Sequence, residues 1–81
     1  MVVSANPSSV RPGGKVDLTA RTSEDANKCT FSLSGAMYKE ESAYGQSPFS
    51  VVVWAGQTKG HVYVSARASN GDSGSTGFDI V

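Results

Sequence analysis

Three groups of residues could carry chemistry in this chain of 81 residues. His61 is the only histidine and Cys29 the only cysteine, and a base beside a thiol is one arrangement that supports nucleophilic catalysis. The run Lys-Glu-Glu at 39–41 offers neighbouring carboxylates, which can act as general acid and general base. The stretch SNGDSGSTGFD at 69–79 superficially resembles a calcium-binding loop, because calcium binds carboxylate and amide oxygens.

The two single residues both have a structural interpretation that their spacing favours. Cys29 alternates in phase with Phe31 and Leu33, which predicts a buried and unreactive thiol. His61 stands at the start of a predicted strand, on the face opposite Val62, which predicts an exposed side chain. The sequence therefore does not predict a thiol–imidazole pair.

The acidic groups lack the spacing of a functional motif. Adjacent acids such as those at 39–41 are usually only solvated, and the stretch 69–79 lacks the twelve-residue pattern of a calcium loop. One histidine and one cysteine are too few for a conventional zinc site. We expect a protein that is not an enzyme and that requires no metal or cofactor.

Charge and hydropathy argue against two kinds of partner. Seven basic residues balance seven acidic ones, whereas binding to nucleic acid needs a basic excess. No apolar run approaches the roughly 18 residues of a membrane span, and the N-terminus has no signal-peptide pattern. A single cysteine also excludes a disulfide within the chain. We therefore expect no nucleic-acid and no membrane partner.

Alternation of apolar and polar residues, which is typical of antiparallel strands with one wet face, dominates the chain. It occurs at 15–22, 29–34, 60–68 and 78–81, and shorter strands are expected at 2–5 and 49–54. The inward residues are expected to be Val16, Leu18, Phe31, Leu33, Val62, Val64, Phe78 and Ile80. Turns or irregular segments are expected at 23–28, 35–48, 55–59 and 69–76.

Six or seven short strands, with turn signals about every 8–12 residues, are typical of a β-sandwich. We predict an all-β fold with two antiparallel sheets and a single domain over 1–81. The segment NPSSVRPGG at 6–14 interrupts the first strand with two prolines, which lack an N–H to donate. We expect the first strand to break there and to resume in the other sheet.

Two stretches resemble a known family. NPSSVRPGGKVDLTA at 6–20 resembles the N-terminal signature of bacterial and bacteriophage immunoglobulin-like domains, and GHVYVSARASNGDSG at 60–74 resembles their late strand. The resemblance implies an immunoglobulin-like sandwich. It also implies a structural role, since such domains occur as decoration on phage capsids and tails.

The segment FSVVVW at 49–54 is apolar on both of its faces. If Phe49, Val51 and Val53 point inward, Val52 and Trp54 point outward, and the opposite register exposes the other set. Two explanations for the outward apolar residues stay open: the 35–48 segment covers them, or they contact another protein. The residues expected at a protein-binding surface are Val52, Trp54, Met37, Tyr38 and Tyr44.

Three classes of function follow from these patterns. The first is a non-catalytic virion surface protein, a capsid or tail decoration that docks on a partner protein; a chain that starts at Met1 without a signal peptide suits it. The second is a spacer or adhesin module of a larger secreted bacterial protein. The third is a carbohydrate-binding module that uses Trp54 or the tyrosines as stacking platforms. The expected location is the virion surface or the cell surface.

Overall fold

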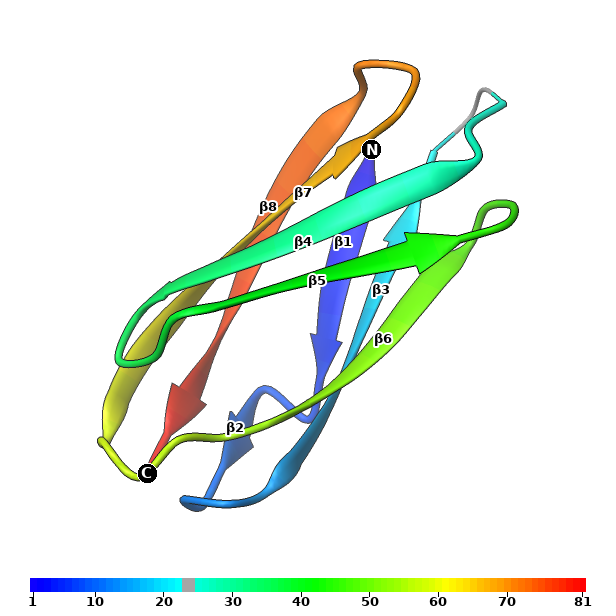
Figure 1. Ribbon diagram of the computed structural model, residues 1–81. Coiled ribbons are helices and arrows are strands. Elements are labelled where there is room, and N and C mark those ends of the chain that lie inside the picture. Colours follow the sequence, from blue (N-terminus) through cyan, green and yellow to red (C-terminus); the bar gives the residue numbers. More distant parts are fainter. Residues whose placement is uncertain (23–24) are drawn as a thin grey trace.

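Strands make up the fold in the computed structural model, which describes residues 1–22 and 25–81 (Figure 1). They are β1 (Val2–Asn6), β2 (Ser9–Val10), β3 (Lys15–Arg21), β4 (Lys28–Gly35), β5 (Lys39–Tyr44), β6 (Phe49–Trp54), β7 (Gly60–Ala68) and β8 (Ser73–Ile80). No helix occurs in the described ranges, so the all-β prediction is confirmed. The described residues form eight strands instead of the expected six or seven.

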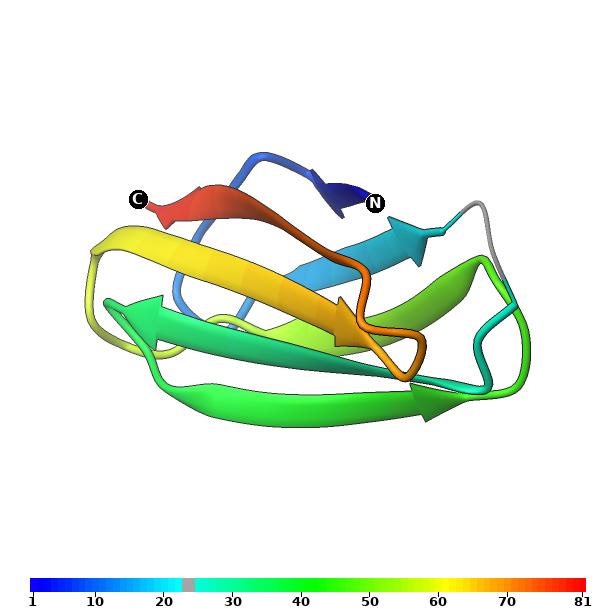
Figure 2. The same ribbon diagram turned by 90° about the horizontal axis from the view of Figure 1, so that it is seen from above.

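Two sheets face each other across the core. One has three strands in the order β1-β3-β6, and the other has five in the order β2-β8-β7-β4-β5. Figure 2 shows the larger sheet curving from β8 round to β5, and its β5 edge comes close to β6. The sandwich-like arrangement of two sheets is therefore as predicted, although the larger sheet is strongly curled.

The first strand breaks at Pro7, as the sequence predicts. Before the break, β1 pairs with β3; after it, β2 pairs with β8 in the other sheet. The β2–β8 pair is parallel, so the expectation of purely antiparallel sheets is wrong at this point. The pair is parallel because the chain crosses between the sheets without turning back. Backbone N–H groups of Asp79 and Val81 donate to the carbonyl oxygens of Ser8 and Val10, at 2.9 and 2.8 Å.

The core lies between the two inner faces. All eight predicted core residues are at most 3% exposed, so the predicted inward faces are confirmed. Further buried apolar residues are Val10, Ala20, Cys29, Phe49, Val53, Ala55, Ala66 and Ala68. No polar side chain is fully buried among the described residues, so hydrophobic burial is the main stabilising term.

Two predictions of irregular structure are wrong. The 35–48 segment contains β5, which pairs with β4, and the 69–76 loop is shorter because β8 already begins at Ser73. In both places the inward positions are occupied by residues such as Lys39, Glu41 and Gly74 instead of large apolar side chains. These segments become strands through backbone hydrogen bonds to a neighbour, which apolar alternation does not reveal. In the expected 23–28 turn, residues 23 and 24 lie outside the described ranges, and β4 begins at Lys28.

The turn after β4 depends on Gly35. Its φ is +93°, a backbone conformation that side chains with a Cβ rarely adopt. A Cβ at this position would lie 2.5 Å from the carbonyl oxygen of His61. The same oxygen accepts a hydrogen bond of 3.0 Å from the N–H of Ala36, so β7 holds the start of the turn closely.

Candidate functional site

Strand β6 adopts the first of the two registers that the sequence leaves open. Phe49 and Val53 are buried and Val51 is partly buried against the core. Val52 is 39% exposed and Trp54 is 61% exposed on the outer face of the three-stranded sheet. Trp54 is the only tryptophan, and it is the largest side chain left uncovered on that sheet.

Charged residues stand directly beside this apolar pair. Across the β3–β6 ladder, Val52 lies opposite Asp17 and Trp54 lies opposite Lys15. We call these four residues the Trp54 face. Neither charged group forms an ion pair within the described part of the chain. The exposed indole is therefore flanked by charged side chains of both signs.

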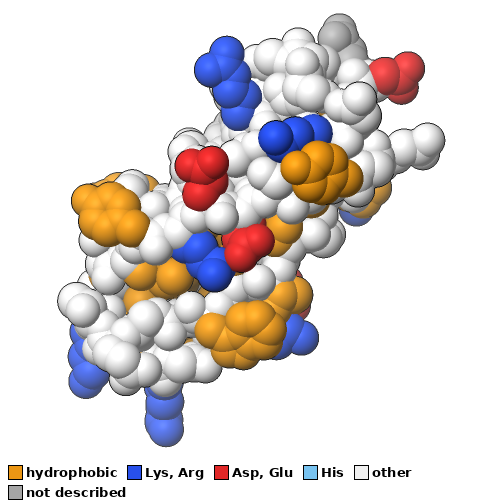
Figure 3. All heavy atoms as spheres, in the orientation of Figure 1, with side chains coloured by type: hydrophobic (Ala, Val, Ile, Leu, Met, Phe, Trp, Pro, Cys, Tyr) orange, Lys and Arg blue, Asp and Glu red, His pale blue; other side chains and the backbone are white. Residues whose placement is uncertain are grey.

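The three residues predicted from the 35–48 segment do not join the Trp54 face as a unit. Met37 is partly buried and packs against the core. Tyr38 and Tyr44 are among the most exposed hydrophobic residues, and Tyr44 lies opposite Lys28 in the five-stranded sheet. Figure 3 shows hydrophobic side chains on this side of the molecule as separate orange patches with polar side chains between them. The two tyrosines therefore leave Trp54 uncovered.

His61 and Cys29 lie on opposite faces of the five-stranded sheet. His61 is exposed, and its Nδ1 lies 2.8 Å from Oδ1 of Asp79 on β8. Cys29 is completely buried on the inner face, so the predicted exposure of His61 and the predicted burial of Cys29 are confirmed. Burial raises the pKa of the Cys29 thiol, and a backbone hydrogen bond from Arg67 offsets this only in part. The two side chains cannot act together.

Cys29 should therefore react with Ellman's reagent at least about a thousandfold more slowly in the native protein than in denaturant, because only unfolded molecules, roughly one in a thousand or fewer, expose it. The measurement is the rate of thiolate release with and without guanidinium. A matched control combines Cys29→Ala with Ser32→Cys, which places a thiol on the outer face of the same strand. The control should react at once, and fast stoichiometric labelling of the unaltered protein would refute burial.

The acidic run does not form a catalytic pair of carboxylates. Glu40 lies opposite Ser32 and Glu41 opposite Phe31, so the two carboxylates point to opposite faces of the sheet. Glu41 also forms an ion pair with Lys39, at a distance of 3.2 Å between Nζ and Oε1. Across residues 1–22 and 25–81, three or more metal-ligating side chains do not come together anywhere.

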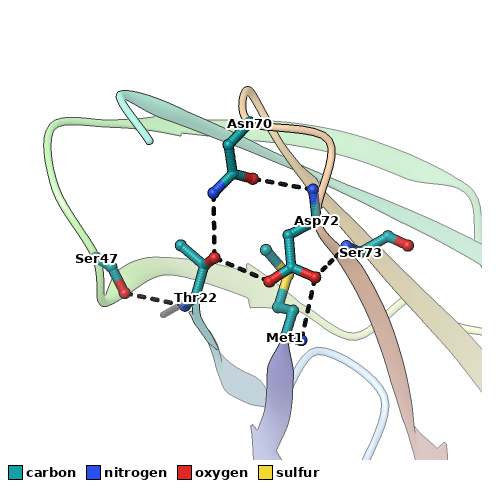
Figure 4. A network of polar contacts seen from close by, with 6 residues as sticks. All are labelled: Met1, Thr22, Ser47, Asn70, Asp72 and Ser73. Carbon is teal, nitrogen blue, oxygen red and sulfur yellow. Dashed lines mark hydrogen bonds and ion pairs between the residues drawn. The ribbon is translucent and has the colours of Figure 1, made fainter. Parts of the chain in front are cut away.

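In the stretch that resembled a calcium loop, the carboxylate of Asp72 accepts hydrogen bonds from other groups of the chain (Figure 4). Oδ1 of Asp72 accepts from the Met1 amine at 3.3 Å and from the N–H of Ser73 at 3.0 Å. Its Oδ2 accepts from the Thr22 hydroxyl at 2.8 Å, and Asn70 donates to the same hydroxyl oxygen at 3.2 Å. Hydrogen bonding from Thr22, and then from the N-terminal amine, lowers the pKa of Asp72. This network ties the β7–β8 turn to the ends of β1 and β3.

A second surface was missed by the sequence analysis. The outer face of the five-stranded sheet carries a shallow depression of about 530 Å³, lined by hydroxyl side chains together with Glu40 and Arg67. We call it the hydroxyl face and define its hydroxyl residues as Thr30, Ser32, Ser65, Ser73 and Ser75. The sequence does show small polar residues at alternate positions of three segments, and this pattern could have indicated the surface. Whether these residues lie side by side, however, depends on the order of the strands in the sheet.

The chain matches no protein-family model, and no curated protein or solved structure shows significant similarity to it. Within the described ranges, no helix has the length and apolar character needed to cross a membrane. The Trp54 face and the hydroxyl face are thus the features from which function can be inferred.

Proposed function

We propose that this chain is a non-catalytic interaction module with an immunoglobulin-like fold, which docks on a partner protein at the surface of a bacteriophage particle. The resemblance of residues 6–20 and 60–74 to bacterial and bacteriophage immunoglobulin-like domains, which occur on phage capsids and tails, supports a location on the particle surface. The observation that carries the docking role is the exposure of Trp54 beside Val52 on an ordered sheet.

The strand order supports an immunoglobulin-like assignment. In immunoglobulin sandwiches the first, second, fourth and fifth strands share one sheet, and the third, sixth and seventh share the other. The fourth strand has no counterpart in the three-stranded sheet described here. Here β1, β3 and β6 form one sheet, whereas β4, β7 and β8 lie together in the other. Strand β5 adds to the edge beside β4, as the extra strand of variable-type domains does.

The Trp54 face suits a protein partner because of its chemistry. Tryptophan is among the residues that contribute most to protein interfaces, especially when a partner desolvates it completely. Lys15 and Asp17 beside it would supply a polar rim with both signs of charge. Oppositely charged groups of the partner could then fix its orientation on the sheet.

Substitution Trp54→Ala should weaken attachment to the particle at least about tenfold while changing stability by no more than about 0.5 kcal/mol. The exposed indole makes few internal contacts, so its loss affects the partner more than the fold. Attachment is measured as the fraction of protein that co-sediments with purified particles from the native source. Iodide quenching should show that the indole is accessible in the isolated domain.

Tyr63→Ala provides the matched control, since Tyr63 is also 61% exposed but lies on the other sheet. It should leave attachment unchanged. The proposal fails if Trp54 is protected from iodide in the isolated domain, or if Trp54→Ala mainly lowers the melting temperature and leaves attachment intact.

A further inference from the structure

The hydroxyl face is built by the pairing of three strands, β4, β7 and β8. Ser32 of β4 lies opposite Ser65 of β7, which in turn lies opposite Ser75 of β8. In the neighbouring row, Arg67 stands between Thr30 and Ser73. Neighbouring strands are about 4.8 Å apart, so the side chains form a regular array with about that spacing across the sheet.

Most hydrogen-bonding capacity of this array is unused. The hydroxyls of Ser32, Ser65, Ser73 and Ser75 make no hydrogen bond to any other residue in the described ranges. Only Thr30 has such a partner, the Ser42 hydroxyl at 3.3 Å. Because each hydroxyl can both donate and accept, the array matches a ligand that itself carries many hydroxyl groups.

Two charged side chains complete the lining. Arg67 and Glu40 lie on strands either side of β4, and neither has an ion-pair partner among the described residues. The guanidinium offers only donors and the carboxylate only acceptors, so they extend the range of groups that a ligand can contact. Their charges cancel, which favours a neutral ligand over a phosphate or a strongly charged peptide.

Exposed tyrosines stand at the two ends of the array. Tyr44 lies opposite Lys28 and Tyr63 lies opposite Ser34, six residues further along β4. At about 3.3 Å per residue, the ends are about 20 Å apart, which suits an extended chain of rings better than one ring. The negative face of an aromatic ring attracts the polarised C–H groups of a sugar.

Both tyrosine rings are positioned by neighbours. The His61 ring packs edge-on against Tyr63 with centroids 4.6 Å apart, and Asp79 holds that histidine. Gly77, opposite Tyr63, leaves the space that the imidazole occupies, since a Cβ there would lie 2.6 Å from Nε2. At the other end, the Lys28 ammonium lies 5.6 Å from the centre of the Tyr44 ring. A ring that is already held in place loses less conformational entropy when it binds a ligand.

We propose that the hydroxyl face binds a neutral oligosaccharide, with Tyr44 and Tyr63 as stacking platforms and Arg67, Glu40 and the serines as hydrogen-bonding groups. This site is separate from the Trp54 face, so it does not rest on the docking role proposed above. A protein partner suits this surface less well, because its centre lacks the exposed apolar side chains that protein interfaces bury.

The test is a titration of the isotope-labelled domain with four neutral oligosaccharides: chitohexaose, cellohexaose, maltohexaose and mannohexaose. At millimolar concentrations, at least one should shift backbone amide signals of β4, β7 and β8 around the depression. Signals of β3 and β6 should stay unchanged. The proposal is overturned if none of the four sugars shifts these signals, or if the shifts fall on the Trp54 face.

Variants then distinguish recognition from a weak general affinity for sugars. Tyr63→Ala and Arg67→Ala should each reduce affinity at least about fivefold, whereas Tyr63→Phe, which keeps the ring, should bind as before. Trp54→Ala is the matched control and should bind normally. Equal affinity of all variants would overturn the site, without affecting the docking proposal.

Discussion

Substitution Phe31→Ala should lower the free energy of unfolding by about 3–5 kcal/mol, the usual cost of removing a buried aromatic ring. Phe31 is completely buried on the inner face of β4, and the ring packs within the cluster formed by both sheets. Unfolding in urea, followed by circular dichroism, measures the loss. Small domains are stable by only about 5–15 kcal/mol, so this one change removes a large part of the total.

Two further variants keep this prediction testable. Phe31→Leu retains much of the apolar volume and should cost clearly less, which matters if the alanine variant does not fold. Tyr38→Ala removes an aromatic ring that is 83% exposed and should cost no more than about 0.5 kcal/mol. If Phe31→Ala cost as little as Tyr38→Ala, the inner face of β4 would be wrongly assigned.

Substitution Gly35→Ala should be the most damaging glycine change in the turns, at about 2–4 kcal/mol. Part of this cost is the positive φ, which alanine adopts only under strain. The rest is the contact between the new Cβ and the His61 carbonyl oxygen, which would disturb the hydrogen bond from Ala36. Thermal unfolding of the two proteins gives the difference.

Gly71→Ala separates the two causes. Its φ of +91° almost equals that of Gly35, but a Cβ there would have no atom within 4 Å. It should therefore show only the strain, and cost at least about 1 kcal/mol less than Gly35→Ala. Equal losses for both variants would mean that the close approach of β7 to the turn contributes nothing.

The sequence predicted those strands whose inward residues are large and apolar. The alternation through Phe31 and Leu33, or through Val62 and Val64, repeats every second residue, and burial of one face requires that pattern. It did not predict β5, because the inward positions of that strand hold the charged residues Lys39 and Glu41 instead of apolar ones. These two residues lie opposite core residues of β4. At the edge of a curled sheet such side chains still reach solvent, so the local pattern carries no apolar period.

The candidate surfaces were predictable only in part, for a related reason. Alternation restricted β6 to two registers, and the packing of Phe49 and Val53 in the core selects the one that exposes Trp54. The hydroxyl face could not be found in this way. Its rows join Ser32, Ser65 and Ser75, which come from three strands, and their adjacency follows from the order of the sheet.

The crossing of the first strand determines how the domain responds to tension. The chain ends lie toward opposite ends of a molecule 36 Å long, so a pull between them acts nearly along the strands (Figure 1). The hydrogen bonds of the sheets lie across that direction. In the parallel β2–β8 pair, such a pull would load the bonds that Ser8 and Val10 accept in shear, both together. The two sheets would thus share a mechanical load that an unbroken first strand would place on one of them alone.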